Sequence, residues 1–408
     1  MLSSSPEVTP TQEIHDCVVV GMGAMGSAAT YHLAKRGLRV LGLEQFNIPH
    51  TMGSSHGYSR IIRMAYFEDD RYIPLLRRSY ELWFELEKLH GEKLFHQTGS
   101  MDMGPEDGEI VKRSVFSCDK HNLPYELLRG EEINTRFPAF QVPSNYVACF
   151  QPDGGFLVPE KCIVAYVEAA MKVGARVQAR ERMLSYRLRE DGIVVVSTNK
   201  GEYLTKKLCV TAGAWASKLL PELQHLAQPE RQVLGWFQPL PGEDLAKYKP
   251  DRLPVANIET SKGLFYYSFP MYQVPGVKVG CYHHFYEKVD PDTINREPTL
   301  QDEEQVRDVL RQFLPGANGP TMSLAACMFT NSPDEHFIID THPVLPQVVI
   351  AAGFSGHGFK FASVVGELLA DLVIEGHTVP EANLFKMDRL RDLSKVRRLH
   401  DFVPQAKL

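Results

Sequence analysis

Three glycines and one glutamate near the N-terminus have the types and spacing of a phosphate and ribose site. Gly21, Gly23 and Gly26 form a G-x-G-x-x-G pattern, and Glu44 follows 23 residues after the first of them. Such a turn lets the backbone approach a pyrophosphate, and an acidic side chain at this distance accepts ribose hydroxyl groups. Because no arginine that would favour a 2′-phosphate stands beside Glu44, the expected ligand is FAD or NAD, and not NADP.

The sequence around these glycines predicts the elements that a dinucleotide site requires. Residues 15–20 form an apolar run typical of a short buried strand, residues 27–36 have helical spacing, and residues 38–43 predict the next parallel strand. The turn would then place the unpaired N–H groups of a helix N-terminus at the phosphates. The alternative, glycines that only pack a helix on a sheet, accounts less well for these coordinated features.

Two later apolar runs, residues 208–213 and 348–353, also end in small-residue turns. Three such strand ends indicate one sheet whose carboxyl edge the chain revisits. Because only one G-x-G-x-x-G is present, a long ligand that touches several of these ends favours FAD over a nicotinamide. Residues 223–322 are richer in aromatic residues, proline and alternating β patterns, and we expect them to form a second domain that faces the substrate.

Composition restricts the class of protein. The chain has 408 residues, with 44 Lys+Arg against 50 Asp+Glu and a net charge of −6, so nucleic acid is not an expected partner. Its length predicts two or three domains. The 7 cysteines show no paired spacing of a zinc site or disulfide framework, and we expect no metal. No long apolar stretch or apolar leader is present, so we expect no membrane association.

Long spaced motifs closely resemble the monomeric sarcosine oxidase family, which includes N-methyltryptophan and pipecolate oxidases. They are GSSHGYSRIIR at residues 53–63, DPDTINRE at 290–297, CMFTNSPDEHFIID at 327–340 and GFSGHGFKF at 353–361. The resemblance implies an α/β fold, in which an FAD-binding Rossmann-like domain joins a catalytic domain built on a mixed β-sheet. It also implies oxidation of a secondary or N-methyl amino acid to an imine, with O2 reduced to H2O2.

The domain boundaries that we predict are discontinuous. Residues 14–87, 150–222 and 323–388 form the FAD-binding domain, and residues 88–149 and 223–322 the catalytic domain. Residues 1–13 and 389–408 are terminal segments.

The resemblance assigns cofactor contacts residue by residue. Cys327 matches the cysteine that family members bond covalently to the 8-methyl carbon of the flavin. His56 and Arg60 match residues near the flavin, where a positive charge would favour the thiolate of Cys327. Gly356 and His357 belong to the motif that contacts the cofactor. The alternative interpretation of Cys327 is a free cysteine that packs in the core as a small apolar residue.

The same resemblance assigns substrate and oxygen contacts. Arg63 and Lys360 match the pair that holds the substrate carboxylate, where the alternative is two ordinary surface cations. Lys278 matches the lysine that promotes reaction with O2, where the alternative is a solvated strand lysine.

Tyr267, His283 and Tyr72 match residues in or near the substrate cavity. Tyr267 is also compatible with a core-strand aromatic residue. His283, beside His284, is also compatible with half of a solvated pair.

Two departures from the family pattern concern the substrate. Phe329 stands where sarcosine-oxidising members usually have tyrosine, which makes the cavity more apolar. Cys281 is an extra residue between Lys278 and His283. The preferred amine is therefore left open by the sequence.

The expected protein is an FAD oxidase, with FAD attached through Cys327, a small amino-acid substrate and O2 as partners, and a monomeric state. An NAD-linked amino-acid dehydrogenase and a non-catalytic flavin-fold binding protein are the alternatives. The last three residues, Ala406, Lys407 and Leu408, resemble a peroxisomal address and predict that compartment, with the cytoplasm as the alternative.

Overall fold

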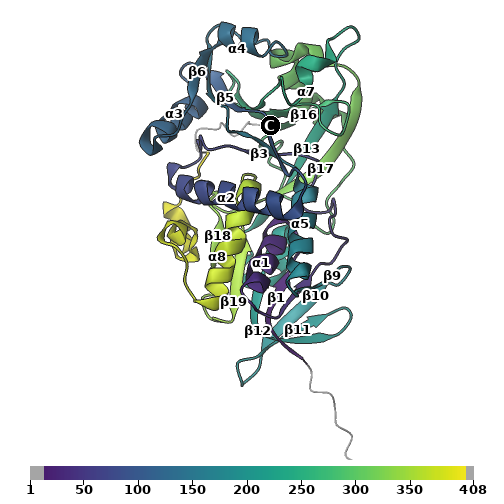
Figure 1. Cartoon of the computed structure of the whole chain (residues 1–408), viewed down its shortest axis with the longest axis vertical. Coiled ribbons are helices and arrows are strands. Elements are labelled where there is room, and N and C mark those ends of the chain that lie inside the picture. Colours follow the sequence, from purple (N-terminus) through teal and green to yellow (C-terminus); the bar gives the residue numbers. More distant parts are fainter. Residues whose placement is uncertain (1–12, 401–408) are drawn as a thin grey trace, which may run out of the picture.

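Two eight-stranded sheets form the framework of the computed structural model, which describes residues 13–400 (Figure 1). In the first sheet β1 lies between β12 and β2, and these three strands are parallel. A further parallel strand, β19, pairs with the last residues of β12. The strands of this sheet are β10 (Met183–Leu188), β11 (Val194–Thr198), β12 (Glu202–Val210), β1 (Ile14–Val20), β2 (Val40–Leu43), β9 (Arg176–Gln178), β19 (Val348–Ala352) and β18 (Ile338–Thr341).

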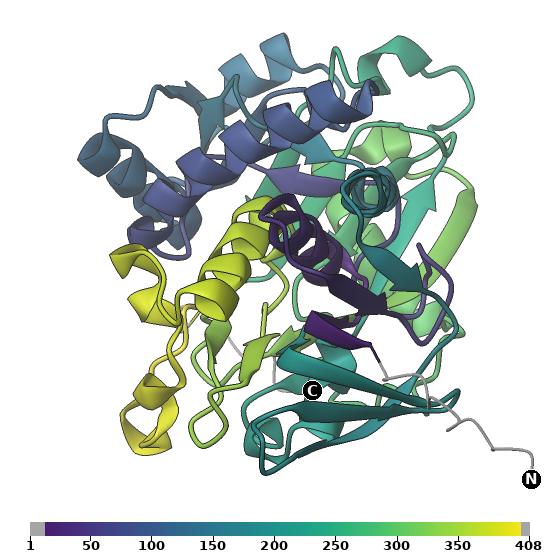
Figure 2. The ribbon, with the colours of Figure 1, turned by 60° about the horizontal axis from the view of Figure 1, so that its bottom comes forward.

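Strand β1 is covered on both faces, which explains why it reads as a continuous apolar run. Cys17 and Val19 belong to a core shared with helices α1 and α8, whereas Val18 and Val20 point into a core on the other face. The helices packed over the first face are α1 (Ala24–Lys35), α5 (Pro159–Lys172), α8 (Ala362–Ile374) and α2 (Ile73–His90). Figure 2 shows α1, α2 and α8 side by side over this sheet.

The second sheet is mixed and mostly antiparallel. Only β14 and β5 pair in parallel, and α7 (Leu300–Phe313) buries Val306, Leu310 and Phe313 against the sheet. Its strands, in spatial order, are β17 (Thr321–Asn331), β13 (Gln228–Phe237), β16 (Val277–Cys281), β15 (Phe265–Phe269), β14 (Val255–Glu259), β5 (Ser100–Pro105), β7 (Tyr146–Gln151) and β6 (Glu126–Arg129).

A third, three-stranded sheet carries one of the predicted site motifs. It consists of β3 (Arg60–Ile62), β8 (Gly155–Leu157) and β4 (Phe95–Gln97). The other α-helices are α3 (Glu109–His121), α4 (Gly130–Arg136) and α6 (Ala216–Leu219). Short 3₁₀ helices are η1 (Asp70–Tyr72), η2 (Gly213–Trp215), η3 (Pro221–Leu223), η4 (Leu245–Tyr248), η5 (Pro315–Ala317), η6 (Phe359–Phe361), η7 (Pro380–Phe385), η8 (Met387–Leu390) and η9 (Leu393–Lys395).

The predicted α/β fold and its mixed second sheet are confirmed. The first sheet is also mixed, because β1, β2, β9, β12 and β19 pair in parallel, whereas the pairs β10–β11, β11–β12 and β18–β19 are antiparallel. Helix α1 begins at Ala24, earlier than the expected residue 27, because Gly23 is already its N-cap. The domain division stays a prediction. Its expected boundaries at residues 150 and 323 fall inside β7 and β17, which are both strands of the second sheet.

Candidate functional site

The glycine turn after β1 is shaped by close backbone contacts. A Cβ at Gly21, where φ is +92°, would lie 2.6 Å from the Thr211 carbonyl oxygen, and a Cβ at Gly26 would lie 1.8 Å from the Gly21 carbonyl oxygen. Both positions therefore require glycine for packing. Gly23 differs, because the nearest atom to its Cβ would be Ser55 Oγ at 3.8 Å. The space in front of the α1 N-terminus is open, as an approaching pyrophosphate needs.

Glu44 stands at the end of β2 and lines the same cavity. Its Oε2 accepts the N–H of Met22 at 2.9 Å and its Oε1 accepts that of Phe46 at 2.9 Å. Each carboxylate oxygen keeps lone pairs for a further donor. These contacts hold an acceptor beside the glycine turn, where a ribose would lie.

The three predicted strand ends meet at one cavity of about 270 Å³. Val20 pairs with Val210, and Val210 pairs with Ile350, so the residues after β1, β12 and β19 share one edge of the parallel sheet. The cavity continues from this edge to the second sheet. Its lining includes Gly21, Gly23, Glu44, Thr211, Gly353, Gly356, His357, Lys360, Arg60, Arg63, Tyr267, Lys278 and Cys327.

Cys327 lies on β17 with its side chain buried beside Arg60. Its Sγ is 3.9 Å from Arg60 Nη2 and 3.9 Å from the carbonyl oxygens of Gly53 and Ser54. Arg60 is itself fixed, since Nη2 donates to the Ser54 carbonyl oxygen at 2.7 Å. A second cation, Arg296, interacts electrostatically with the Cys327 thiol. Two arginine side chains therefore lie near this cysteine.

Lys278 on β16 is 2% exposed, so the alternative of a solvated strand lysine is wrong. Its Nζ donates to the carbonyl oxygens of Gly57 at 2.9 Å and Ser59 at 2.8 Å, and to Ser59 Oγ at 3.1 Å. The ring of Phe269 lies 4.4 Å away. Burial, with the nearby Arg60 charge, lowers the pKa of Lys278 well below its ordinary value. Lys278 is thus an oriented amino group in the cavity wall.

Arg63 and Lys360 are both buried, so neither is an ordinary surface cation. Arg63 Nη2 donates to both carboxylate oxygens of Glu68, at 3.0 and 2.8 Å, and its Nε lies 3.5 Å from Asp102 Oδ1. Although burial alone would raise it, the Arg63 charge lowers the pKa of Glu68 to about 2. Two anions therefore surround one guanidinium.

Lys360, in η6 after the β19 turn, lies on the same side of the site as Arg63. Its Nζ donates to the His357 carbonyl oxygen at 2.8 Å and stands 5.1 Å from the centre of the Tyr66 ring. Burial lowers the pKa of Lys360 to about 7. His357 is held by the Tyr66 hydroxyl, 2.5 Å from Nδ1, and by the Glu335 carbonyl oxygen, 2.9 Å from Nε2. Burial lowers the pKa of His357 to about 3.

Tyr267 lines the cavity from β15, opposite Gly280 of β16. A Cβ at Gly280 would lie 2.1 Å from the Tyr267 hydroxyl, so glycine there makes room for this ring. Glycine at position 356 likewise makes room for Phe329, because a Cβ there would lie 2.5 Å from the Phe329 ring. The cavity wall therefore contains two aromatic rings that each pack against a glycine.

Four predicted residues lie outside the cavity lining, and one of them is Gly26, whose role is the close backbone packing described above. His56 is buried without a partner at Nε2, and burial together with Arg60 lowers its pKa to about 3. Tyr72 is buried in the layer behind the cavity, where its hydroxyl is 3.0 Å from His336 Nδ1. His283 is 0% exposed, so the solvated-pair alternative is wrong. Its Nδ1 lies 2.9 Å from Glu230 Oε1, and the neighbouring Tyr282 lines the cavity instead.

Several cavity residues were not singled out in the sequence. Phe67 packs its ring 4.3 Å from the Arg63 guanidinium, and Asn257 donates to Asp102 at 2.7 Å. Glu68 and His400 complete this side. A charged residue next to the GSSHGYSRIIR motif could have drawn attention to Glu68. His400 carries no local signal, because only the fold brings the end of the chain here.

Comparisons with known proteins identify the family. A family model described as FAD dependent oxidoreductase matches residues 16–372. Monomeric sarcosine oxidase from Bacillus sp. (strain NS-129) is 45% identical over 380 residues, which cover 92% of this chain and 96% of that protein. The chain belongs to the sarcosine oxidase family of FAD-dependent oxidoreductases. The family assignment made from the motifs is therefore confirmed.

More distantly similar proteins cover the chain equally well. N-methyl-L-tryptophan oxidase from Yersinia pestis (strain Pestoides F) is 34% identical over 380 residues, which cover 92% of this chain and 100% of that protein. Among solved structures, NikD, an unusual amino acid oxidase essential for nikkomycin biosynthesis, has a TM-score of 0.79 at 25% identity and covers 92% of this chain and 97% of that chain. FAD is therefore the cofactor, which removes support from the NAD-linked alternative.

The residues present fit FAD in this sarcosine oxidase family member. The open space at Gly23, the acceptor Glu44 and the ends of β12 and β19 follow one continuous cavity to Cys327. No helix among residues 13–400 is both long and apolar enough to cross a membrane. Residues 1–12 of the predicted terminal segment 1–13, and residues 401–408 of the segment 389–408, which include the tripeptide Ala406-Lys407-Leu408, lie outside the described residues.

Proposed function

We propose that this protein oxidises a secondary or N-methyl amino acid to an imine and reduces O2 to H2O2. One observation carries the proposal. The buried cations Arg63 and Lys360 line the same cavity as Cys327 and Lys278, so an anionic substrate and a flavin have adjoining places. Buried cations of this kind suit the carboxylate of an amino acid.

FAD, when bound, accepts the electron pair of the amine carbon and later passes it to O2. The glycine turn and the α1 N-terminus would hold the pyrophosphate, and Glu44 the ribose. We propose that Cys327 attaches the cofactor covalently. Its support is the position of the thiol in the cavity and the nearness of the Arg60 and Arg296 side chains.

Carboxylate capture follows from the charges around Arg63. In the free protein Glu68 occupies one edge of the guanidinium and Asp102 lies near Nε. An incoming carboxylate takes the place of Glu68 at Arg63 and draws a proton onto Lys360, whose pKa of about 7 leaves it only partly charged beforehand. In this proposal the substrate carboxylate replaces Glu68 as the partner of the Arg63 guanidinium.

The rest of the substrate meets a largely apolar wall. Phe67, Phe265, Tyr267 and Phe329 line the cavity, and Phe329 offers no hydroxyl group. An uncharged amine is compatible with this wall, whereas an ammonium group would have to lose its solvation. The amine is thus held in the neutral form that can lose electrons.

Lys278 is proposed to serve the reaction with O2. Reduction of O2 creates negative charge, and an amino group already oriented by three acceptor oxygens stabilises it without rearrangement. Its low pKa is no obstacle, because negative charge forming nearby raises the affinity of Lys278 for a proton.

Oxygen consumption by the purified holoenzyme tests the function. The panel contains sarcosine, N-methyltryptophan, pipecolate and proline, each compared with an amine that lacks the carboxylate. We expect turnover with at least one secondary amino acid, with H2O2 formed in equal amount, and none with the matched amines. Turnover that does not depend on the carboxylate contradicts the proposal.

Two further properties are proposed. The name of monomeric sarcosine oxidase, the relative at 45% identity, supports a monomeric state, which the elution volume on gel filtration tests. A peroxisomal location rests on the C-terminal tripeptide alone. The relatives from Bacillus sp. and Yersinia pestis are bacterial, and bacteria have no peroxisomes, so we propose a cytoplasmic location.

A further inference from the structure

The last described residues of the chain form part of the cavity wall. After η9, residues 396–400 run back to the loop between β17 and β18, and we call them the C-terminal strap. Leu399 donates its N–H to the Asp334 carbonyl oxygen at 3.2 Å, and its own carbonyl oxygen accepts from Arg113 Nη1 at 3.2 Å. His400 lines the cavity and is 2% exposed.

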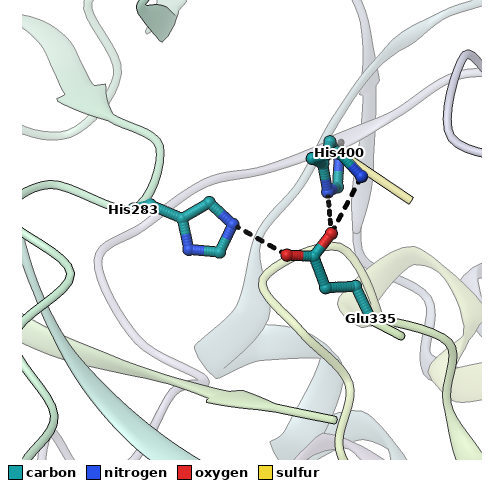
Figure 3. A group of neighbouring side chains, drawn as sticks. All are labelled: His283, Glu335 and His400. Carbon is teal, nitrogen blue, oxygen red and sulfur yellow. Dashed lines mark hydrogen bonds and ion pairs between the residues drawn. The ribbon is translucent and has the colours of Figure 1, made fainter. Parts of the chain in front are cut away.

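Glu335 is the anchor of the C-terminal strap. Its Oε2 accepts the backbone N–H of His400 at 3.0 Å and lies 2.7 Å from His400 Nδ1, while its Oε1 accepts from Arg398 Nε at 2.8 Å. Figure 3 shows the carboxylate between the His400 ring and the His283 ring, whose Nε2 is 3.5 Å away. Although burial alone would raise it, His283 and His400 lower the pKa of Glu335 far below its ordinary value.

The residue types of this cluster also suit a divalent metal, since ligand atoms of His283, Glu335 and His400 all lie within 4.8 Å of one another. The Arg398 guanidinium argues against that reading. It donates two hydrogen bonds to Oε1 of the same carboxylate, so a metal would sit beside a fixed positive charge. The cluster is better explained as an ionic clamp on the end of the chain.

The clamp is connected to the proposed carboxylate site. The Glu335 side chain holds His400, its carbonyl oxygen accepts from His357 Nε2, and the His357 carbonyl oxygen accepts from Lys360 Nζ. The His400 ring also packs 6.2 Å from Phe67, which covers the Arg63 guanidinium, and 5.0 Å from Tyr282. His400 therefore borders the end of the cavity where Arg63 and Lys360 lie.

We propose that His400 is a specificity-determining residue that limits the size of the group on the substrate α-carbon. This inference rests on the proposed function, because the carboxylate at Arg63 and Lys360 fixes the α-carbon next to it. Because Glu335 holds the His400 ring at the end of the cavity near Arg63 and Lys360, the α-carbon can carry only hydrogen or a small group. The substrate class is accordingly an N-methyl or cyclic amino acid without a bulky aromatic group on the α-carbon.

Ligand binding to the oxidised holoenzyme tests the proposal without turnover. Acetate and indole-3-acetate carry the same carboxylate with a small and a bulky group on the adjacent carbon, and each is titrated while the flavin absorbance is followed. In the wild type we expect acetate to bind at least tenfold more tightly than indole-3-acetate. In His400→Ala we expect the ratio to fall at least tenfold, with acetate affinity changed less than twofold.

Matched variants separate size selection from a merely structural effect. His400→Gln keeps most of the side-chain volume and is expected to keep the wild-type preference for acetate over indole-3-acetate. Arg398→Ala removes a partner of Glu335 and should lower this preference. Arg391→Ala changes an exposed residue that pairs with Asp388 at the surface, and should leave the ratio unchanged. An unchanged ratio in His400→Ala, or equal weakening of both ligands, overturns the proposal. If neither carboxylate binds any variant, the proposed function fails instead.

Discussion

Arg63 Nη2 donates to both carboxylate oxygens of Glu68 inside the cavity where we place the substrate carboxylate. The guanidinium therefore has a partner before substrate arrives. Because two anions cannot occupy the same edge, Glu68 and the substrate compete for it. Because of this competition, removing Arg63 and removing the charge of Glu68 should change the affinity for a carboxylate ligand in opposite directions.

Arg63→Ala should weaken binding of a carboxylate ligand by roughly 2–5 kcal/mol, the usual effect of removing one partner of a buried charge pair. Glu68→Gln should strengthen binding, because the amide competes less well for the guanidinium. Acetate titrations of the oxidised holoenzyme measure both. A loss in Arg63→Ala that is just as large for an amine without a carboxylate would show that Arg63 acts elsewhere.

The pKa of Lys360 predicts a pH dependence for carboxylate binding. Burial lowers this pKa to about 7, so the side chain is charged below that pH and increasingly neutral above it. Acetate affinity should hold steady below about pH 7 and fall as the pH rises through that value, because a proton must then be taken up. Lys360→Met should bind weakly at every pH. A wild-type profile that is flat, or that rises with pH, contradicts the assignment.

Covalent attachment is predicted at Cys327. Cys327→Ala should still bind FAD through the glycine turn and Glu44 but release it on acid precipitation, whereas the wild-type precipitate stays yellow. Cys281→Ala is the matched control, since this thiol is also buried on the second sheet but does not line the cavity. Colour that survives in precipitated Cys327→Ala places the bond on another residue.

Lys278 is predicted to act on O2 and not on the amine. Lys278→Met keeps the aliphatic stem and removes the amino group, so packing against Phe269 is largely preserved. Reaction of the reduced enzyme with O2 should slow by about 10²–10³-fold, the effect of losing one preorganised donor at a developing charge. Reduction by substrate should stay near the wild-type rate. Equal slowing of both steps, measured by stopped flow, would remove Lys278 from the oxygen site.

Local patterns predicted which strand ends converge on the cavity, for a physical reason. The glycine turn, Glu44 and the ends of β12 and β19 lie on one edge of a parallel sheet, and strand direction alone brings them together. Arg63 was found through its motif, but its partners were not. Glu68 and Asp102 neutralise it only because the loop after β3 folds against β5.

The positions of His283 and His400 depend on tertiary structure and could not be predicted from the sequence. Strand β16 ends at the extra residue Cys281, and in the turn that follows His283, His284 and Tyr286 have positive φ values of 59°, 26° and 55°. This twisted turn directs His283 to Glu230 and Glu335 and leaves Tyr282 on the cavity. His400 was unforeseen, because its position depends on the Glu335 clamp and on no pattern within residues 389–400.

We propose that a secondary or N-methyl amino acid reduces FAD in this cavity and that O2 reoxidises it. The most direct measurement is a single turnover of the wild-type holoenzyme, in which the flavin absorbance is followed during anaerobic mixing with each amino acid and then on admission of O2. We predict bleaching by a secondary or N-methyl amino acid, followed by full return of colour with one H2O2 per flavin. Flavin that no such amino acid bleaches, or that stays reduced in O2, would contradict the account.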